Sequence, residues 1–463
     1  MVPTVTDLKG GSVFMSLKKE VFEAYKNHIL THMEENRRGA QAMKESLEHS
    51  PLYWNGIVEK TVHIPKVFDE ETIRSFQEIA TITYRIFGKV IQEYRTHEDY
   101  RALFPFSKEL EELILLPAPY NGFLPIARFD LFYNEDTGEF SFCEINADGT
   151  AAMLRDLELR KALINNPAHQ AVIRKYELEP FELFDSWVRT FMALYDTYPK
   201  KKTHPNVAII DFLENATLRD FEEYARHFQA AGINCEICDI RRLEYRDGVL
   251  YSPAGNPIDA VYRRAVTADV MDHYPEVTAF LDAVRNDDVF LAGAFATQIV
   301  HTKWLFYVLH HERTKSVLTK EELAFVKKHV PLTVRFSSEY ISLEEVQTNK
   351  DAYIIKPMDA YASKGVYAAG HEYTQKDWET LTEDLYGKGY ICQQYCKQYL
   401  TENIDFAWGD GEWHPFMNMP GLYVFNGVFS GFLMRMACGE NIIVAHDNER
   451  TAPVFVVRGK RRQ

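Results

Sequence analysis

Four polar residues in the first third of this 463-residue chain have the types and spacing to bind a metal ion and handle a phosphate. They are Arg128 and Asp130, two positions apart, and Glu144 and Asn146, again two positions apart. Side chains alternate between the faces of a β-strand, so residues two apart leave the same face. If the intervening loop holds an odd number of residues, Arg128 lies opposite Glu144 and Asp130 one diagonal step away.

Such a patch would hold a cation, two carboxylates and an amide oxygen. Asp130, Glu144 and Asn146 supply hard oxygen ligands, and Mg²⁺ accepts one or two carboxylates and takes its other ligands from water and substrate phosphates. The spacing therefore predicts a Mg²⁺ site. A solvated strand face with a surface ion pair remains the alternative.

The segments that carry these residues have the pattern of a β-hairpin. Residues 126–133 and 139–146 show a period of two, and residues 134–138 between them include Asn, Asp and Gly, which favour turns. Cys143 alternates with Glu144 and is therefore expected on the opposite face, in the core.

In this order, the residues resemble a signature of the glutathionylspermidine synthase family of ATP-grasp ligases, which pairs an R-x-D strand with an E-x-N-A-D segment. Here the two parts are residues 128–130 and residues 144–148. Further matches follow in the family's order: Thr302-Lys303, Lys356-Pro357, Gln393-Gln394-Tyr395, Arg435, Ile442-Ile443 and Asp447. The matches extend from about residue 120 to about residue 450.

The resemblance implies a ligase that uses ATP and Mg²⁺. A small-molecule or peptide carboxylate would attack the γ-phosphate to give an acyl phosphate and ADP, and an amine would then displace phosphate. The serines with which family members contact glutathione are replaced here by Gly149, Thr150, Ala151 and Ala152, so those contacts are not carried over. Because the N-terminal region is expected to be helical, we do not expect the amidase domain of the bifunctional members here.

The resemblance also assigns roles. Lys303 and Lys356 would hold the β- and γ-phosphates, because phosphoryl transfer needs positive charge there. Arg128 and Arg435 would stabilise the transferring phosphoryl group and the acyl phosphate. The remaining nucleotide contacts are Gln393 or Gln394, beside the adenine edge, and Asp447. Without the family context, solvent-exposed lysines and surface arginine pairs remain open alternatives.

Residues 358–370 lie where the family has a glycine-rich loop over the phosphates, but only Ser363-Lys364-Gly365 matches it here. This departure motivates a second hypothesis, a nucleotide-binding or scaffold protein with the fold and little or no turnover. A dinucleotide-dependent dehydrogenase is disfavoured, since residues 211–219 contain no glycine and hence no G-x-G-x-x-G motif.

Composition limits the partners. The chain has 67 Asp and Glu against 52 Lys and Arg, a formal net charge of −15, which argues against nucleic acid and anionic membranes. In the first thirty residues no window approaches the roughly 18 apolar residues of a membrane span.

Six scattered cysteines indicate a reducing cytoplasm. Cys235 and Cys238 are expected on opposite faces of a strand, as structural residues.

The expected class is α+β: an ATP-grasp fold with an embedded α/β unit (pre-ATP-grasp, Rossmann-like) and a helical N-terminal region. Residues 1–204 would hold the helical region and the Mg²⁺-binding hairpin, residues 205–300 the α/β unit, and residues 301–463 the nucleotide-binding part. Within the unit, the pattern predicts a strand at 207–212, a helix at 218–231 and a strand at 234–239. Arg263-Arg264 would be either a clamp for a substrate carboxylate or a surface pair.

Overall fold

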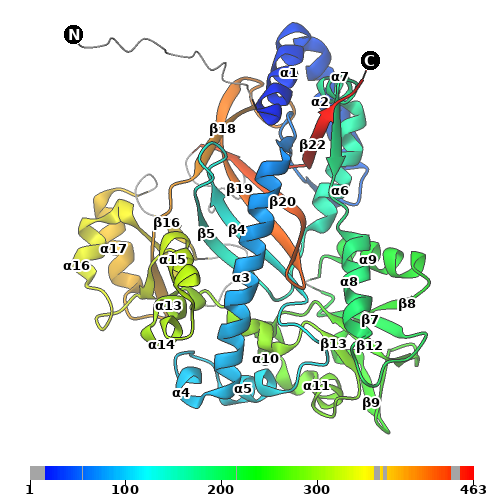
Figure 1. Ribbon diagram of the computed structural model, residues 1–463, viewed down its shortest axis with the longest axis vertical. Helices are drawn as coiled ribbons and strands as arrows, with labels where there is room; N and C mark the ends of the chain where they lie inside the picture. Colours follow the sequence, from blue (N-terminus) through cyan, green and yellow to red (C-terminus); the bar gives the residue numbers. More distant parts are fainter. Residues whose placement is uncertain are drawn as a thin grey trace, which may run out of the picture.

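The computed structural model describes residues 16–54, 56–214, 216–358, 365–368, 373–439 and 449–462. They form a mixed structure with several separate sheets, which confirms the α+β class. Figure 1 shows a central sheet crossed by the long helix α3 (Glu70–Thr96), a green α/β unit at lower right and a yellow lobe on the left. Within the described ranges, no helix is both long and apolar enough to cross a membrane.

The central sheet has six antiparallel strands drawn from both halves of the chain. They are β4 (Ile126–Tyr133), β5 (Phe140–Asn146), β18 (Tyr399–Ile404), β19 (Trp413–Phe425), β20 (Val428–Cys438) and β21 (Glu449–Ala452). Their order is β21-β20-β19-β4-β5, and β18 also pairs with β19. The predicted hairpin, β4 and β5, is confirmed and lies directly beside the C-terminal strands.

Helix α3 covers one face of this sheet (Figure 1). Its buried side chains recur every three or four positions and pack into one apolar cluster with Phe129 and Leu131 of β4. The Asp69 side chain caps its N-terminus. Arg128 and Asp130 alternate with the apolar residues of β4 and therefore face away from α3.

The α/β unit is built on a parallel sheet of order β13-β12-β7-β8. Its strands are β7 (Asn206–Asp211), β8 (Asn234–Asp239), β12 (Ala260–Arg263) and β13 (Phe290–Ala292), and its helices are α8 (Phe184–Tyr195), α9 (Leu218–Ala230), α10 (Thr267–Asp272) and α11 (Thr278–Arg285). A small antiparallel sheet adds β9 (Glu244–Arg246), β10 (Val249–Tyr251) and β11 (Pro257–Ile258). The predicted strand, helix and strand here are confirmed to within one residue at their ends.

A third sheet forms the lobe drawn in yellow in Figure 1. Its antiparallel strands are β14 (Thr333–Arg335), β15 (Tyr353–Pro357), β16 (Tyr367–Ala368) and β17 (Tyr390–Gln394), in the order β14-β17-β15-β16, with helices α16 (Leu343–Thr348) and α17 (Gln375–Leu385). Trp378 of α17 packs in an apolar cluster with Ile355 and Cys392 of this sheet. Ile354, on the other face, packs instead against Phe132 of the central sheet.

Residues 16–100 are mainly helical, as expected. Helices α1 (Leu17–Thr31) and α2 (Met33–Glu48) pack against α7 (Pro167–Ile173), and a three-stranded sheet of β3 (Lys66–Phe68), β22 (Val454–Lys460) and β6 (Tyr176–Pro180) joins the two ends of the chain. The other elements are β1 (Tyr53–Trp54), β2 (Ile57–Val58), α4 (Glu98–Arg101), α5 (Lys108–Leu115), α6 (Met153–Ala162), α12 (Gln298–His301), α13 (Leu305–His310), α14 (Glu312–Lys315) and α15 (Lys320–His329).

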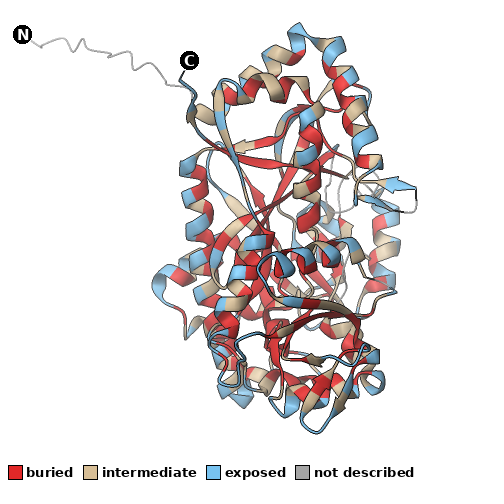
Figure 2. Ribbon diagram, turned by 90° about the vertical axis from the view of Figure 1, so that its right-hand side faces the viewer, coloured by how far each residue is buried: buried red, intermediate tan, exposed pale blue. Residues whose placement is uncertain are grey.

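Buried residues run through both the central sheet and the α/β unit (Figure 2). Cys235 and Cys238 of β8 belong to two different apolar clusters, which confirms that they face opposite sides of their strand. Burial raises the pKa of each thiol to about 12. Both cysteines are therefore core residues.

Candidate active site

The four hairpin residues share one face, but in a different register from the predicted one. Asp130 lies opposite Glu144, and Arg128 lies opposite Asn146. Two shifts of one residue each explain the difference. Tyr133 pairs with Phe140, so the loop of residues 134–139 has an even number of residues, and a β-bulge after Asp130 then gives β5 one extra residue, Cys143. The pairing of Arg128 with Glu144, which we expected for a loop with an odd number of residues, therefore does not form.

The same bulge changes the surroundings of Cys143. The residue is buried, as expected, and burial raises its pKa to about 12. It packs, however, with Phe132 and Ile354 between the central sheet and the third sheet, whereas Ile145 packs on the α3 side. The expectation that Cys143 points away from the site is wrong, because a bulge interrupts strict alternation.

Asp130 is the centre of the hydrogen-bond network. It is fully buried, and its Oδ1 accepts from Nε of Arg128 at 2.7 Å. Its Oδ2 accepts from Nη2 of Arg128 at 3.0 Å, Nη2 of Arg435 at 2.7 Å and Nδ2 of Asn146 at 3.0 Å. One carboxylate thus holds both predicted arginines and the predicted amide in place.

Gly421 of β19 is a site residue that the sequence reasoning missed. It lies directly opposite Asp130, and a Cβ atom there would come within 2.5 Å of Oδ1 of Asp130 and 2.9 Å of Cδ of Arg128. Only glycine leaves room for the ion pair at this position. The available signal was an isolated glycine inside a strand pattern, which often marks a close approach.

Glu144 is the more accessible acid of the site, with 31% of its side chain exposed. Burial raises the pKa of its carboxyl group, but four surrounding cations outweigh burial and hold that pKa well below its usual range. These cations are Lys303, Arg435, Lys356 and Arg128. Glu144 is therefore ionised throughout the physiological pH range.

The two predicted lysines come from separate elements. Lys303 lies between α12 and α13 and is partly buried, and Lys356 lies on β15 and is 4% exposed. The positive charges of both lysines lower the pKa of Glu144. Nη2 of Arg435 lies 3.9 Å from Oε1 of Glu144. The fold thus gathers basic residues from three distant segments around the hairpin.

Gln393 and Gln394 have different surroundings. Gln393 is buried, and its Oε1 accepts a hydrogen bond of 2.8 Å from Nζ of Lys356. Its Nε2 donates to Oγ1 of Thr333 at 2.9 Å. Gln394, the next residue of β17, is exposed. Among the described residues, Gln393 is the member of the pair whose side chain forms a hydrogen bond to another predicted site residue, Lys356.

Some predicted features lie outside the described residues. They are Asp447, Ile442-Ile443 and most of the loop at 358–370. Of that loop, Met358 and residues 365–368 are described, and strand β16 within it pairs with β15.

Arg263 and Arg264 are not surface arginines, since they are 2% and 4% exposed. Arg263 forms an ion pair of 2.8 Å with Asp148 and donates to the Gly293 carbonyl at 2.7 Å. Arg264 donates to the carbonyl of Thr150. Both guanidinium groups thus join the α/β unit to the segment after β5, and these donors are engaged within the protein.

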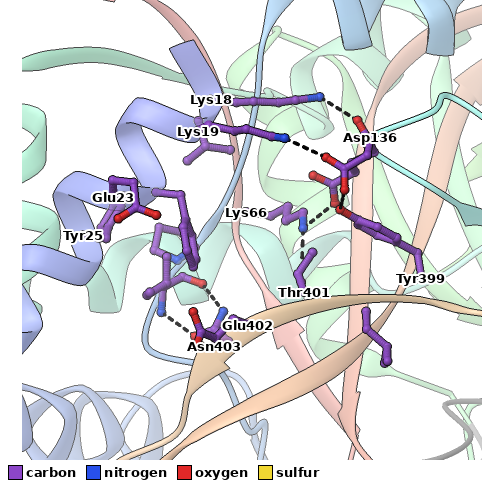
Figure 3. Close-up of a pocket in the computed structure, with 16 residues that line it drawn as sticks. Lys18, Lys19, Glu23, Tyr25, Lys66, Asp136, Tyr399, Thr401, Glu402 and Asn403 are labelled. Atoms are coloured by element: carbon purple, nitrogen blue, oxygen red, sulfur yellow. Dashed lines mark hydrogen bonds and ion pairs between the residues drawn. The ribbon is translucent and has the colours of Figure 1, made fainter. Parts of the chain in front are cut away.

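A separate cavity of about 370 Å³ lies beside the turn of the hairpin (Figure 3). Lys66 forms an ion pair with Glu135, and Nζ of Lys19 lies 2.9 Å from Oδ1 of Asp136. The hydroxyl of Tyr399 donates to Oδ2 of Asp136 at 2.9 Å. The described residues that line this cavity include none of the predicted site residues. Its polar contacts anchor the hairpin turn to α1, β3 and β18.

Comparisons with known proteins give a fold relative. No protein-family profile matches the chain, and no curated protein matches it in sequence. Among solved structures, the chain is similar to a glutathione synthetase-like effector from Globodera pallida in its apo form. The TM-score is 0.56 at 10% identity, over 96% of this chain and 98% of that chain. At this identity the similarity shows a shared fold.

Proposed function

We propose that this protein is an ATP-dependent carboxylate–amine ligase of the ATP-grasp type, similar to glutathionylspermidine synthase. It forms an amide bond through an acyl phosphate and releases ADP and phosphate. The order of the sequence motifs and the fold similarity to a glutathione synthetase-like protein over nearly the whole chain both support this assignment.

One observation carries the proposal: four cations from separate parts of the chain surround the hairpin carboxylates. The pKa of Glu144 is lowered by the charges of Arg128, Arg435, Lys303 and Lys356. Asp130, which pairs with Arg435, is the second acid of the group. Four positive groups against two negative ones leave an excess of positive charge in a chain whose net charge is −15. A local excess of this kind favours a polyanionic ligand such as a triphosphate.

The protein's own residues would divide the work. Lys303 and Lys356 bind the β- and γ-phosphates and stabilise the charge that develops during transfer. Arg435 lies between Asp130 and Glu144 and stabilises the transferring group, and Arg128 holds the Asp130 carboxylate in place. No enzyme nucleophile is needed, because the substrate carboxylate attacks phosphorus directly.

The hairpin fits Mg²⁺ with two ligand residues, Asn146 and Glu144. The amide nitrogen of Asn146 donates to Asp130 at 3.0 Å and to Glu144 at 3.4 Å, so its Oδ1 faces away from both acids. This oxygen and the Glu144 carboxylate are hard ligands, enough for an ion that takes its remaining ligands from water and phosphates. When bound, the ion would neutralise charge on the phosphate oxygens. Asp130 would support this pair from behind, since arginines and Asn146 already occupy its oxygens.

The remaining nucleotide contacts are proposals from the resemblance. Gln394 and the backbone beside it lie at the end of β17, where the adenine ring would pack, and Asp447 would act from the late segment.

ADP release over a panel of peptides and polyamines tests the proposal. We expect the wild type to release ADP only when an acid and an amine are both present. Glu144→Gln should lower the rate at least about 100-fold. Loss of a residue that only orients a metal ligand can already lower activity by that factor, and loss of the ligand itself should cost no less. Glu139→Gln, at an exposed carboxylate of the same hairpin, is the matched control. Equal rates for wild type and Glu144→Gln would contradict the proposal.

A second candidate is a nucleotide-binding protein with the same fold and little or no turnover. The full occupation of Asp130 favours it, because a site whose described hairpin residues leave two ligand residues, Glu144 and Asn146, can bind a metal–nucleotide complex without the geometry for transfer. Equilibrium binding of ATP·Mg²⁺, with no ADP released for any pair of acid and amine, would support this candidate.

A further inference from the structure

Gln393 joins three strands of the third sheet through its side chain. Its Oε1 accepts from Nζ of Lys356 on β15, and its Nε2 donates to Oγ1 of Thr333 on β14, while Gln393 itself lies on β17. All three side chains are buried, with 4% of Gln393, 4% of Lys356 and 2% of Thr333 exposed.

The orientation of this amide is fixed from behind. The hydroxyl of Thr333 donates to the carbonyl of Pro331 at 3.0 Å, so its oxygen is left to accept from Nε2 of Gln393. The amide carbonyl must then face Lys356. Both ends of the Gln393 side chain are therefore engaged within the protein.

A neutral acceptor suits a lysine that must bind phosphate. A carboxylate at this position would hold the ammonium group of Lys356 but would also cancel its charge. An amide carbonyl fixes the long side chain and leaves the full positive charge for a ligand. Within the described residues, the other acceptor for Nζ of Lys356 is the Cys143 carbonyl at 3.5 Å, which is long for a hydrogen bond.

We infer that Gln393 is a positioning residue, which aims the Lys356 ammonium group at the triphosphate and does not read the adenine base. This inference rests on the proposed function, because it presumes that Lys356 binds phosphate. It replaces the role for Gln393 that the sequence resemblance indicated, and it leaves base contacts to the neighbouring part of β17.

Binding of three ligands separates positioning from base reading. Calorimetry would compare ATP, GTP and inorganic tripolyphosphate, each with Mg²⁺, for the wild type, Gln393→Ala and the exposed neighbour control Gln394→Ala. Loss of a hydrogen bond to a charged group should weaken binding to Gln393→Ala roughly 10-fold. We expect the same factor for all three ligands and no change in tripolyphosphate binding by Gln394→Ala. A loss confined to ATP would overturn the inference.

A double-mutant cycle tests whether Gln393 acts through Lys356. In a Lys356→Met background, Gln393→Ala should cause no further loss of tripolyphosphate affinity, since the group it positions is gone. A residue with a purely structural role would give additive losses, and that result would overturn the inference. Thr333→Val, which is nearly isosteric, should weaken all three ligands in the same sense, whereas unchanged binding would contradict the proposed chain of contacts.

The two proposals fail in different ways. If the wild type binds neither ATP nor tripolyphosphate, the proposed function is wrong and this inference falls with it. If the wild type binds both, and Gln393→Ala changes only the preference between ATP and GTP, the proposed function stands and only the positioning role is wrong.

Discussion

The carboxylate of Asp130 accepts a hydrogen bond of 2.7 Å from the guanidinium group of Arg435, a residue 305 positions later in the chain. Arg128 pairs with the same carboxylate, which is fully buried. A charge that is buried with its partners is costly to leave unpaired. The packing of the central sheet and the arrangement of the site therefore depend on one side chain.

Asp130→Asn should lower the free energy of unfolding by about 3 kcal/mol or more, because two arginines would lose their buried counter-charge. Urea denaturation followed by circular dichroism would measure the change. Asp247→Asn, at an exposed turn position whose φ is positive and suits Asn, is the control and should change the free energy little. A loss below about 1 kcal/mol for Asp130→Asn would show that the network is not structural.

Gly421→Ala should both destabilise the protein and weaken nucleotide binding. Its methyl group would meet Asp130 and Arg128, and overpacking of this kind typically costs about 1–3 kcal/mol. Gly459→Ala, in strand β22, has no atom within 4 Å of the new Cβ and serves as the matched control. Thermal unfolding and ATP titration would be compared for the two variants, and equal behaviour would rule out the close approach at Gly421.

Asp211 at the end of β7 should make stability depend on pH. Burial raises its pKa to about 6, and the nearby charge of Arg264 offsets this only in part. The folded state then binds a proton at Asp211 more tightly than the unfolded state does. The contribution of Asp211 to stability is therefore largest below about pH 4 and is lost as the pH rises through 6. Asp211→Asn should therefore stabilise the protein at pH 7.5, by up to about 3 kcal/mol, and have little effect near pH 4. An equal gain at both pH values would contradict this account.

Thiol labelling should separate the six cysteines by burial. Cys438 is exposed, Cys396 is partly buried, and the other four are buried. A thiol reagent at pH 8 should react quickly with Cys438 and slowly with Cys396. It should reach the four buried thiols only after denaturation. Cys438→Ser should abolish the fast phase, and persistence of that phase would show that a residue placed in the core is accessible.

The sequence by itself determined the local elements of this protein. The hairpin at β4 and β5, the strand β8 and the helix α9 follow from periodicity and turn residues, which act over only a few positions. The same reasoning placed Cys235 and Cys238 on opposite faces. It also put Arg128 and Asp130 on one face, because alternation along a strand is a local property.

Only the tertiary structure decided how those residues meet. The bulge at Cys143 places Asp130 opposite Glu144. Cys143 itself packs between the central sheet and the third sheet, a contact that no local sequence pattern encodes. The partners of Asp130 and Lys356 depend on strands that are distant in the chain, so the sequence could name Arg435 and Gln393 but not their contacts. Side-chain type follows from the sequence, whereas burial and hydrogen-bond partners follow from which strands pair and in what register.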